Sequence, residues 1–141
     1  MPGPVAPADL RWRAPVSDLE VVTLTLAHGG RPSPGWWDRV RRHSLGWVSA
    51  RDGEELVGFV NVAWDGGDHA FLVDTKTHPR VQRRGLGTAV VRRAAAEARA
   101  AGCEWLHVDF EPHLTGFYLD ACGFRTTAAG LVHLPGLDGL P

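Results

Sequence analysis

The residues best suited to bind an anion lie in one stretch, residues 80–88. Gly85 and Gly87 are one residue apart and allow a ligand to approach the backbone closely. An Ala-rich helical pattern begins at Gly85 or Leu86, and the first N–H groups of a helix have no partner within it. A helix start of this kind attracts phosphate, to which its dipole contributes about 0.3–1 kcal/mol. Three arginines are expected to add guanidinium groups beside the phosphate, namely Arg80, Arg83 and Arg84.

Two other phosphate-binding patterns fit this stretch less well. A Walker A loop needs a Gly-Lys-Ser/Thr triplet, whereas the only lysine of the chain, Lys76, precedes the glycines. A dinucleotide fingerprint needs a third small residue where the chain has Val90, although Asp109 lies close to the required distance downstream. In that fold the glycines follow a strand almost directly, but here residues 76–84 intervene. A dinucleotide-binding domain is therefore the weaker alternative.

The third pattern is Gln/Arg-x-x-Gly-x-Gly/Ala, which the segment Gln82-Arg83-Arg84-Gly85-Leu86-Gly87 fits at every fixed position. This segment resembles the GNAT superfamily of N-acetyltransferases. The resemblance implies that the start of the central helix holds the pyrophosphate of acetyl-coenzyme A, a co-substrate, on backbone N–H groups. It assigns this role to Gln82, Arg83, Arg84, Gly85, Leu86, Gly87 and Thr88. It also implies that backbone N–H groups of the preceding strand bind the pantetheine arm and the acetyl oxygen, and by position these belong to Thr75, Lys76 and Thr77.

A second motif resembles the Tyr-x-x-x-Gly-Phe element of the same family. It contains Tyr118, the only tyrosine of the chain, followed by Gly123 and Phe124. A tyrosine pKa near 10 lies above a thiol pKa near 8.5, so full proton transfer to the leaving thiolate is uphill by about 2 kcal/mol, and Tyr118 is expected to act mainly as a hydrogen-bond donor. Four residues instead of three separate Tyr118 from Gly123, which turns the side chain by about 100° in a regular helix. Either the helix bulges or tightens, or Tyr118 is structural.

Acetyl transfer to an amine also needs a group that removes an ammonium proton, at a cost of about 4–5 kcal/mol at pH 7. In one branch of the family a glutamate on the strand before the glycines does this, but Phe71 stands near the matching position. Asp74 and Glu111 are our first candidates, and Glu111 is also placed to cap the following helix. The other candidates on or just after the two flanking strands are Asp109, His69 and His107.

The adjacent Trp36 and Trp37 are expected to face different ways on one short helix, so that at least one leaves the core. In the family, the segment after the first helix lines the acceptor site. Aromatic rings near acidic residues suit a cationic amine through cation–π contact. The resemblance and these residues together predict a small cationic amine as the acceptor.

Composition excludes several classes of protein. With 141 residues, of which 44% are hydrophobic and 22% charged, the chain is expected to form one globular domain over residues 1–141, with residues 1–8 as a loose N-terminus. A net charge of −1 argues against a nucleic-acid partner. No apolar run approaches the roughly 20 residues of a membrane span, and no signal peptide is evident, so we expect a cytoplasmic protein. Cys103 and Cys122 lack metal-ligand spacing, so no metal site is expected.

Hydrophobic periodicity predicts an α/β fold with a mixed sheet in the order β-α-α-β-β-β-α-β-α-β-β, which is also the order of the GNAT fold. The expected strands are 10–13, 46–50, 55–64, 69–75, 105–110, 124–127 and 131–134. The expected helices are 18–28, with Ser17 and Glu20 as a capping box, 36–43, 86–101 and 114–122.

The sequence therefore predicts an acetyl-coenzyme A-dependent N-acetyltransferase with a small-molecule amine acceptor, and without a nucleic-acid or membrane partner. A homodimer is the assembly considered. The shifted spacing of Tyr118 leaves a second hypothesis, a coenzyme A-binding sensor or interaction module that does not transfer the acetyl group.

Overall fold

The computed structural model describes residues 9–137, and the expected loose segment 1–8 lies outside them. In the described part, a five-stranded sheet runs in the order β1-β2-β3-β4-β5. Strands β1 to β4 are antiparallel neighbours, and β5 is parallel to β4. The strands are β1 (Asp9–Trp12), β2 (Ser44–Asp52), β3 (Glu55–Trp64), β4 (His69–Thr77) and β5 (Trp105–His107). The helices are α1 (Asp18–His28), α2 (Trp36–Val40), α3 (Leu86–Ala100), a π-helix (Gly116–Ala121) and 3₁₀ turns at Arg41–His43, Pro79–Val81, Pro112–Leu114 and Leu134–Gly136.

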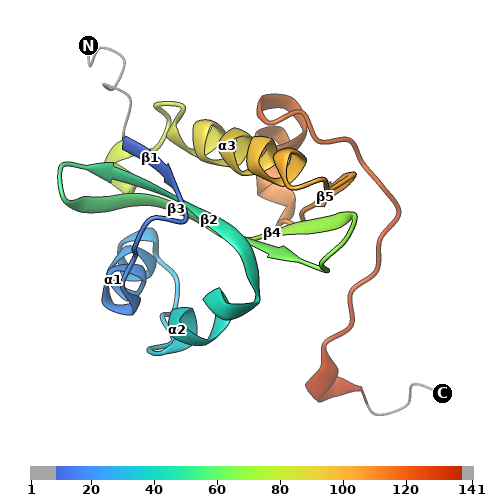
Figure 1. Cartoon of the computed structure of the whole chain (residues 1–141), viewed down its shortest axis with the longest axis horizontal. Helices are drawn as coiled ribbons and strands as arrows, with labels where there is room; N and C mark the ends of the chain where they lie inside the picture. Colours follow the sequence, from blue (N-terminus) through green and yellow to red (C-terminus); the bar gives the residue numbers. More distant parts are fainter. Residues whose placement is uncertain (1–8, 138–141) are drawn as a thin grey trace.

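Helices cover both faces of the sheet (Figure 1). On one face, α3 connects β4 to β5 and packs its apolar side on the strands through Leu86, Val90, Val91, Ala94 and Ala98. On the other face, α1 and α2 enclose a second core around Trp37 and Phe59. The mixed α/β fold predicted from the sequence is therefore confirmed. None of the helices in residues 9–137 is long and apolar enough to cross a membrane.

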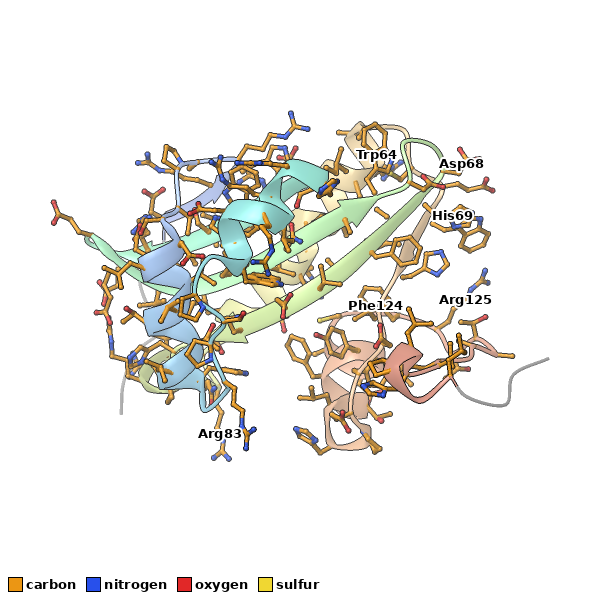
Figure 2. The ribbon with its side chains drawn as sticks, turned by 90° about the horizontal axis from the view of Figure 1, so that it is seen from below. Trp64, Asp68, His69, Arg83, Phe124 and Arg125 are labelled. Atoms are coloured by element: carbon orange, nitrogen blue, oxygen red, sulfur yellow. The ribbon has the colours of Figure 1, made fainter. Side chains whose placement is uncertain are left out.

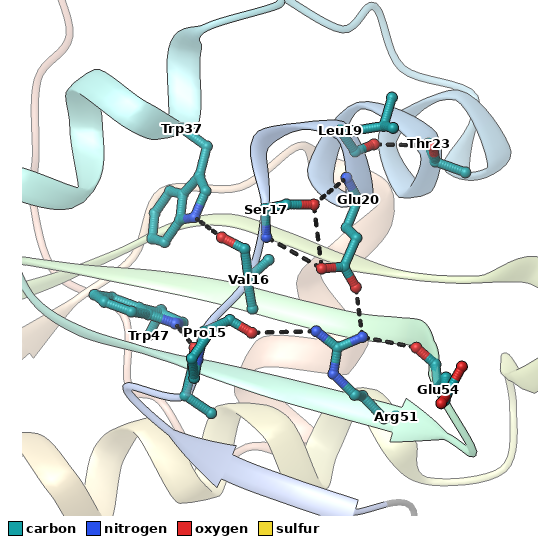
Figure 3. A network of polar contacts seen from close by, with 11 residues as sticks. Pro15, Val16, Ser17, Leu19, Glu20, Thr23, Trp37, Trp47, Arg51 and Glu54 are labelled. Carbon is teal, nitrogen blue, oxygen red and sulfur yellow. Dashed lines mark hydrogen bonds and ion pairs between the residues drawn. The ribbon is translucent and has the colours of Figure 1, made fainter.

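A polar network fixes the start of α1 on the sheet (Figure 3). The Ser17 side chain accepts from the Glu20 N–H at 3.1 Å, and the Glu20 carboxylate accepts from the Ser17 N–H at 3.1 Å, which is the predicted capping box. Glu20 also pairs with Arg51 of β2, and the hydrogen bond from Arg51 is the main reason that the pKa of Glu20 lies below its usual value. Because α1 is fixed in this way, its inner face has a defined position over β4.

Strands β4 and β5 pair only over His69–Phe71 and Trp105–His107 and do not pair further along the chain. A bulge accompanies this separation, since Asn61 pairs with Val73 and Phe59 pairs with Lys76 while Asp74 has a positive φ of 59°. β5 is consequently shorter than the predicted strand 105–110. The backbone of residues 72–77 therefore has no strand partner on the β5 side.

The predicted helix 114–122 is a 3₁₀ turn followed by a π-helix. Its wider turns are closed by an i→i+5 hydrogen bond from the Cys122 N–H to the Phe117 carbonyl at 2.9 Å. Gly123 ends it with a φ of +83°. The helix thus bulges to accommodate the extra residue before Gly123. This is the first of the two alternatives that the sequence left open.

The predicted final hairpin, strands 124–127 and 131–134, is wrong, and with it the last two strands of the predicted order. This segment forms no strand and runs past β5 away from the sheet (Figure 1). Phe124 packs on Tyr118, but the apolar residues of the second predicted strand stay in solvent, with Leu131 90% and Leu134 67% exposed. The physical reason is that β5 offers only three paired residues, so neither a partner edge nor a covering layer is available to order two more strands.

Candidate functional site

The start of α3 is arranged as an anion site. Gly85 precedes the helix with a φ of +82°, a conformation that glycine adopts without strain. The N–H groups that follow, those of Leu86, Gly87 and Thr88, have no partner within the helix. A 3₁₀ turn and a short loop separate these glycines from β4, which itself runs antiparallel to β3. This geometry is unlike a dinucleotide-binding fold, in which the glycines directly follow a parallel strand.

The arginines beside this helix start differ in their partners. Arg80 forms ion pairs with Asp52 at 2.8 Å and with Glu55, so the prediction that it faces the phosphate is wrong. Arg83 and Arg84 are exposed and form no ion pair within residues 9–137. Figure 2 shows Arg83 extending from the body of the protein. These two guanidinium groups are therefore available to an anion.

Gln82 and Gly87 hold the loop and the helix in place. The Gln82 amide donates to the Thr77 carbonyl at 3.3 Å, which links the loop to the end of β4. A Cβ atom on Gly87 would lie 3.2 Å from Cε1 of Phe117, which belongs to the π-helix. Glycine at position 87 thus allows α3 and the π-helix to approach each other closely.

We expect Gly87→Val to weaken acetyl-coenzyme A binding and to lower the free energy of unfolding by about 1–3 kcal/mol, because the branched side chain must displace Phe117. Calorimetric titration and thermal unfolding measure the two effects. Gly87→Ala is the matched control, since it adds the Cβ alone and should have a smaller effect on both. Wild-type affinity in both variants would contradict this account of the helix contact.

Tyr118 lies in an aromatic cluster and is 5% exposed. Its ring stacks on Phe110 at a centroid distance of 4.9 Å and meets Phe117 and Phe124 edge-on at 4.8 and 5.9 Å. Burial raises the pKa of its hydroxyl, and the nearby Thr75 side chain partly opposes this rise. The structure therefore brings Tyr118 to the unpaired part of β4, where the sequence placed binding of the acetyl oxygen.

A pocket of about 170 Å³ opens on the other side of β4. Trp36 contributes to its wall, whereas Trp37 is buried and donates from Nε1 to the Val16 carbonyl at 3.0 Å. The prediction that the two tryptophans face different ways is confirmed. The lining residues come from α1, the loop after it, α2 and β4: Asp18, Val21, Val22, Thr25, Arg31, Pro32, Ser33, Trp36, Asp74 and Lys76.

Asp74 and Lys76 bring opposite charges to this pocket. The Asp74 side chain reaches solvent, so its desolvation is only partial. This partial burial raises the pKa of the Asp74 carboxyl, and the charge of Lys76 opposes the rise. Burial lowers the pKa of Lys76, and Asp74 opposes that change. Because a carboxylate with a raised pKa is a stronger base, Asp74 is suited to accept a proton from an ammonium.

The remaining base candidates lie outside the lining of this pocket. Glu111 is exposed, and its side chain makes no capping hydrogen bond, so the expected capping role is wrong. Asp109 is also exposed. His69 and His107 form a pair with their Nδ1 and Nε2 atoms 2.7 Å apart. Figure 2 shows His69 near the β3–β4 turn, at the end of the sheet opposite Arg83.

Sequence reasoning missed Thr25, Arg31 and Ser33 as pocket residues. Thr25 follows an ordinary helical pattern, and the other two lie in a Pro/Gly-rich loop, so no local signal marks them. Their position depends on how α1 and its loop dock over β4.

Comparison with known proteins identifies one family. Residues 13–124 match the model of the acetyltransferase (GNAT) family. A mycothiol acetyltransferase from Nocardia farcinica is 35% identical over 96 residues, which is 68% of this chain and 27% of that protein. Another from Mycolicibacterium smegmatis is 36% identical over 56 residues, 40% of this chain and 19% of that protein. The chain thus spans about a quarter or less of the length of these curated relatives.

Solved structures agree on the fold. A GNAT family acetyltransferase from Streptococcus pneumoniae superimposes with a TM-score of 0.75 at 23% identity, covering 88% of this chain and 95% of that one. The aminoglycoside N-acetyltransferase AAC(6')-Iy, solved with the bisubstrate analogue CoA-S-monomethyl-acetylneamine, gives a TM-score of 0.72 at 17% identity and covers 91% and 97%.

Proposed function

Because the chain belongs to the GNAT acetyltransferase family, whose members use acetyl-coenzyme A, we propose that it transfers the acetyl group to the primary amine of a small acceptor that is cationic at neutral pH. The observation that carries this proposal is the divergence of β4 from β5. It leaves the backbone of residues 72–77 without a strand partner on the β5 side, while its other side pairs with β3. Acetyl transfer requires three features: the anion site at the start of α3, the open backbone of β4 for the acetyl oxygen, and Tyr118 for the leaving thiolate.

The residues present fit the coenzyme. Unpaired N–H groups of Leu86, Gly87 and Thr88 would hold the pyrophosphate, with Gln82 and Gly85 shaping the loop and Arg83 and Arg84 adding charge. The open side of β4 at Thr75, Lys76 and Thr77 would bind the pantetheine arm and polarise the acetyl oxygen. When bound, the coenzyme supplies an acetyl thioester.

Two side chains would handle the protons. Asp74 takes one from the acceptor ammonium, which frees the nitrogen lone pair to form the C–N bond as the C–S bond breaks, and the nitrogen then releases its second proton to solvent. The Tyr118 hydroxyl, which lies near Thr75 of β4, then donates a hydrogen bond to the departing thiolate. Since burial raises the pKa of Tyr118 further above that of a thiol, the hydroxyl acts as a hydrogen-bond donor while solvent supplies the final proton. Glu111 is the second candidate for the base.

The alternative of a coenzyme A-binding module without transfer arose from the shifted spacing of Tyr118. The π-helix accommodates the extra residue and keeps Tyr118 beside Thr75, so this spacing no longer favours the alternative. The proposal of an acetyltransferase includes three further points: one domain over residues 1–141, a homodimeric assembly and a cytoplasmic location.

Calorimetric titration with acetyl-coenzyme A and, separately, with NAD tests the binding half of this proposal. We expect saturable binding of acetyl-coenzyme A that weakens at high salt, because Arg83 and Arg84 contribute charge at an exposed site. Binding of NAD alone would overturn the proposal and return the dinucleotide hypothesis.

A further inference from the structure

The side chain of Lys76 has no role in the reaction described above, yet its position is unusual. It is the only lysine of the chain and is 8% exposed. Its Nζ atom donates to Oγ1 of Thr25 at 2.8 Å and lies 5.8 Å from the ring centroid of Trp36. Lysine is almost never this deeply buried without a charged partner. Lys76 is therefore a cation for which a partner is expected.

None of the described charged groups around the pocket forms an ion pair with the Lys76 ammonium, although the charge of Asp74 acts on it from a longer distance. Asp18 uses both carboxylate oxygens to accept from the Gly35 and Trp37 N–H groups, at 2.8 and 3.1 Å. Within residues 9–137, Lys76 forms no ion pair with Asp74 or any other carboxylate. An ammonium has three N–H donors, and Thr25 accepts from it once. Donor capacity thus remains at the wall of the pocket.

The pocket presents both signs of charge to a ligand. Lys76 is buried in its wall, Arg31 lies at its exposed rim, and the Asp74 carboxylate belongs to the same lining. We propose that the acceptor carries a carboxylate close to its reacting amine, so that Lys76 binds the carboxylate while Asp74 receives the ammonium. This inference rests on the proposed function and names the class of acceptor, an amino acid or a closely similar compound.

Two further observations agree with a short zwitterionic acceptor. The Trp36 ring already faces the Lys76 ammonium, so it is not free to hold the cation of an acceptor. The cavity of about 170 Å³ is smaller than the roughly 300–1,000 Å³ of pockets for drug-sized ligands. A compound with few atoms between amine and carboxylate fits this space.

Matched acceptors test the proposal through turnover. Glycine, β-alanine and 4-aminobutyrate would each be compared with the corresponding amide by measuring thiol release from acetyl-coenzyme A. Because an amide also changes the pKa of the amine, the acid-to-amide ratio of kcat/KM is compared between proteins. For at least one chain length we expect this ratio to fall about tenfold or more in Lys76→Met and to stay at the wild-type value in Arg39→Gln, which alters an exposed residue of α2 outside the pocket lining. An unchanged ratio in Lys76→Met would overturn the proposal.

A second measurement on the unmutated protein needs no turnover. With ¹³C-labelled lysine, Lys76 gives the only lysine side-chain signal. Saturation with the preferred acid should raise the pKa of Lys76, because a carboxylate beside the ammonium favours its charged form, whereas the amide should not. Equal responses to acid and amide, or none, would overturn the inference whether or not Lys76→Met folds. A response to the acid alone, in a protein that acetylates no amine, would support the acid site and count against the proposed transfer.

Discussion

Tyr118→Phe is expected to lower kcat by roughly 10²–10³-fold, the effect of removing one hydrogen-bond donor to a developing anion, while leaving the affinity for acetyl-coenzyme A nearly unchanged. Phenylalanine preserves the ring that packs against Phe110, Phe117 and Phe124 and removes only the hydroxyl beside Thr75. Because the ring packing is preserved, the free energy of unfolding should change by no more than about 1 kcal/mol. Single-turnover kinetics, calorimetric titration and thermal unfolding measure the three quantities.

Phe124→Leu is the control for Tyr118→Phe. It disturbs the packing around the Tyr118 ring without touching the hydroxyl, so it should affect stability much more than kcat. Wild-type single-turnover rates in Tyr118→Phe would remove Tyr118 from the reaction and leave it with a packing role alone. Water would then protonate the leaving thiolate without help from Tyr118.

The second large effect is expected for Asp74→Asn. If Asp74 is the base, kcat/KM should fall by roughly 10²–10⁴-fold. In the unmutated protein, activity should rise with pH through the pKa of Asp74, which burial places above the ordinary aspartate value, because only the carboxylate can accept a proton. The pH profile of kcat/KM measures this acidic limb, which Asp74→Asn should abolish.

Stability should respond to Asp74→Asn in the opposite direction. A carboxyl whose pKa is higher in the folded than in the unfolded protein favours folding below its unfolded pKa, and this stabilisation is lost as the pH rises through the folded pKa. At neutral pH the charged Asp74 therefore disfavours the folded state, and Asp74→Asn should raise Tm. Glu111→Gln, measured in parallel, distinguishes the two base candidates. Loss of activity in Glu111→Gln alone would transfer the role to Glu111.

Local signals in the sequence predicted the parts of the fold that local interactions stabilise. The bounds of α1 followed from Ser17 and Glu20, whose capping box needs only residues three positions apart. The glycine motif likewise predicted the start of α3 within a residue. The final hairpin could not be predicted correctly, because pairing of residues 124–134 depends on β5, which has only three paired residues.

The burial of Lys76 was hidden from the sequence for a different reason. In a regular strand, Lys76 would lie on the same face as Leu72, which packs beneath α3. The bulge at Asp74 inserts one residue, so that Lys76 pairs with Phe59 and turns toward α1 and α2. A one-residue change in register moves a side chain to the other face of a sheet, and no local pattern marked this change. The extra residue before Gly123, in contrast, did indicate an irregular helix.

Release of free thiol from acetyl-coenzyme A, measured over a panel of primary amines with mass analysis of the products, tests acetyl transfer most directly. We expect at least one small amine to give saturable thiol release, matched mole for mole by the N-acetylated amine and strongly reduced in Tyr118→Phe. A protein that binds acetyl-coenzyme A but releases no thiol above the uncatalysed rate with any amine of the panel would contradict the account and indicate a coenzyme A-binding module.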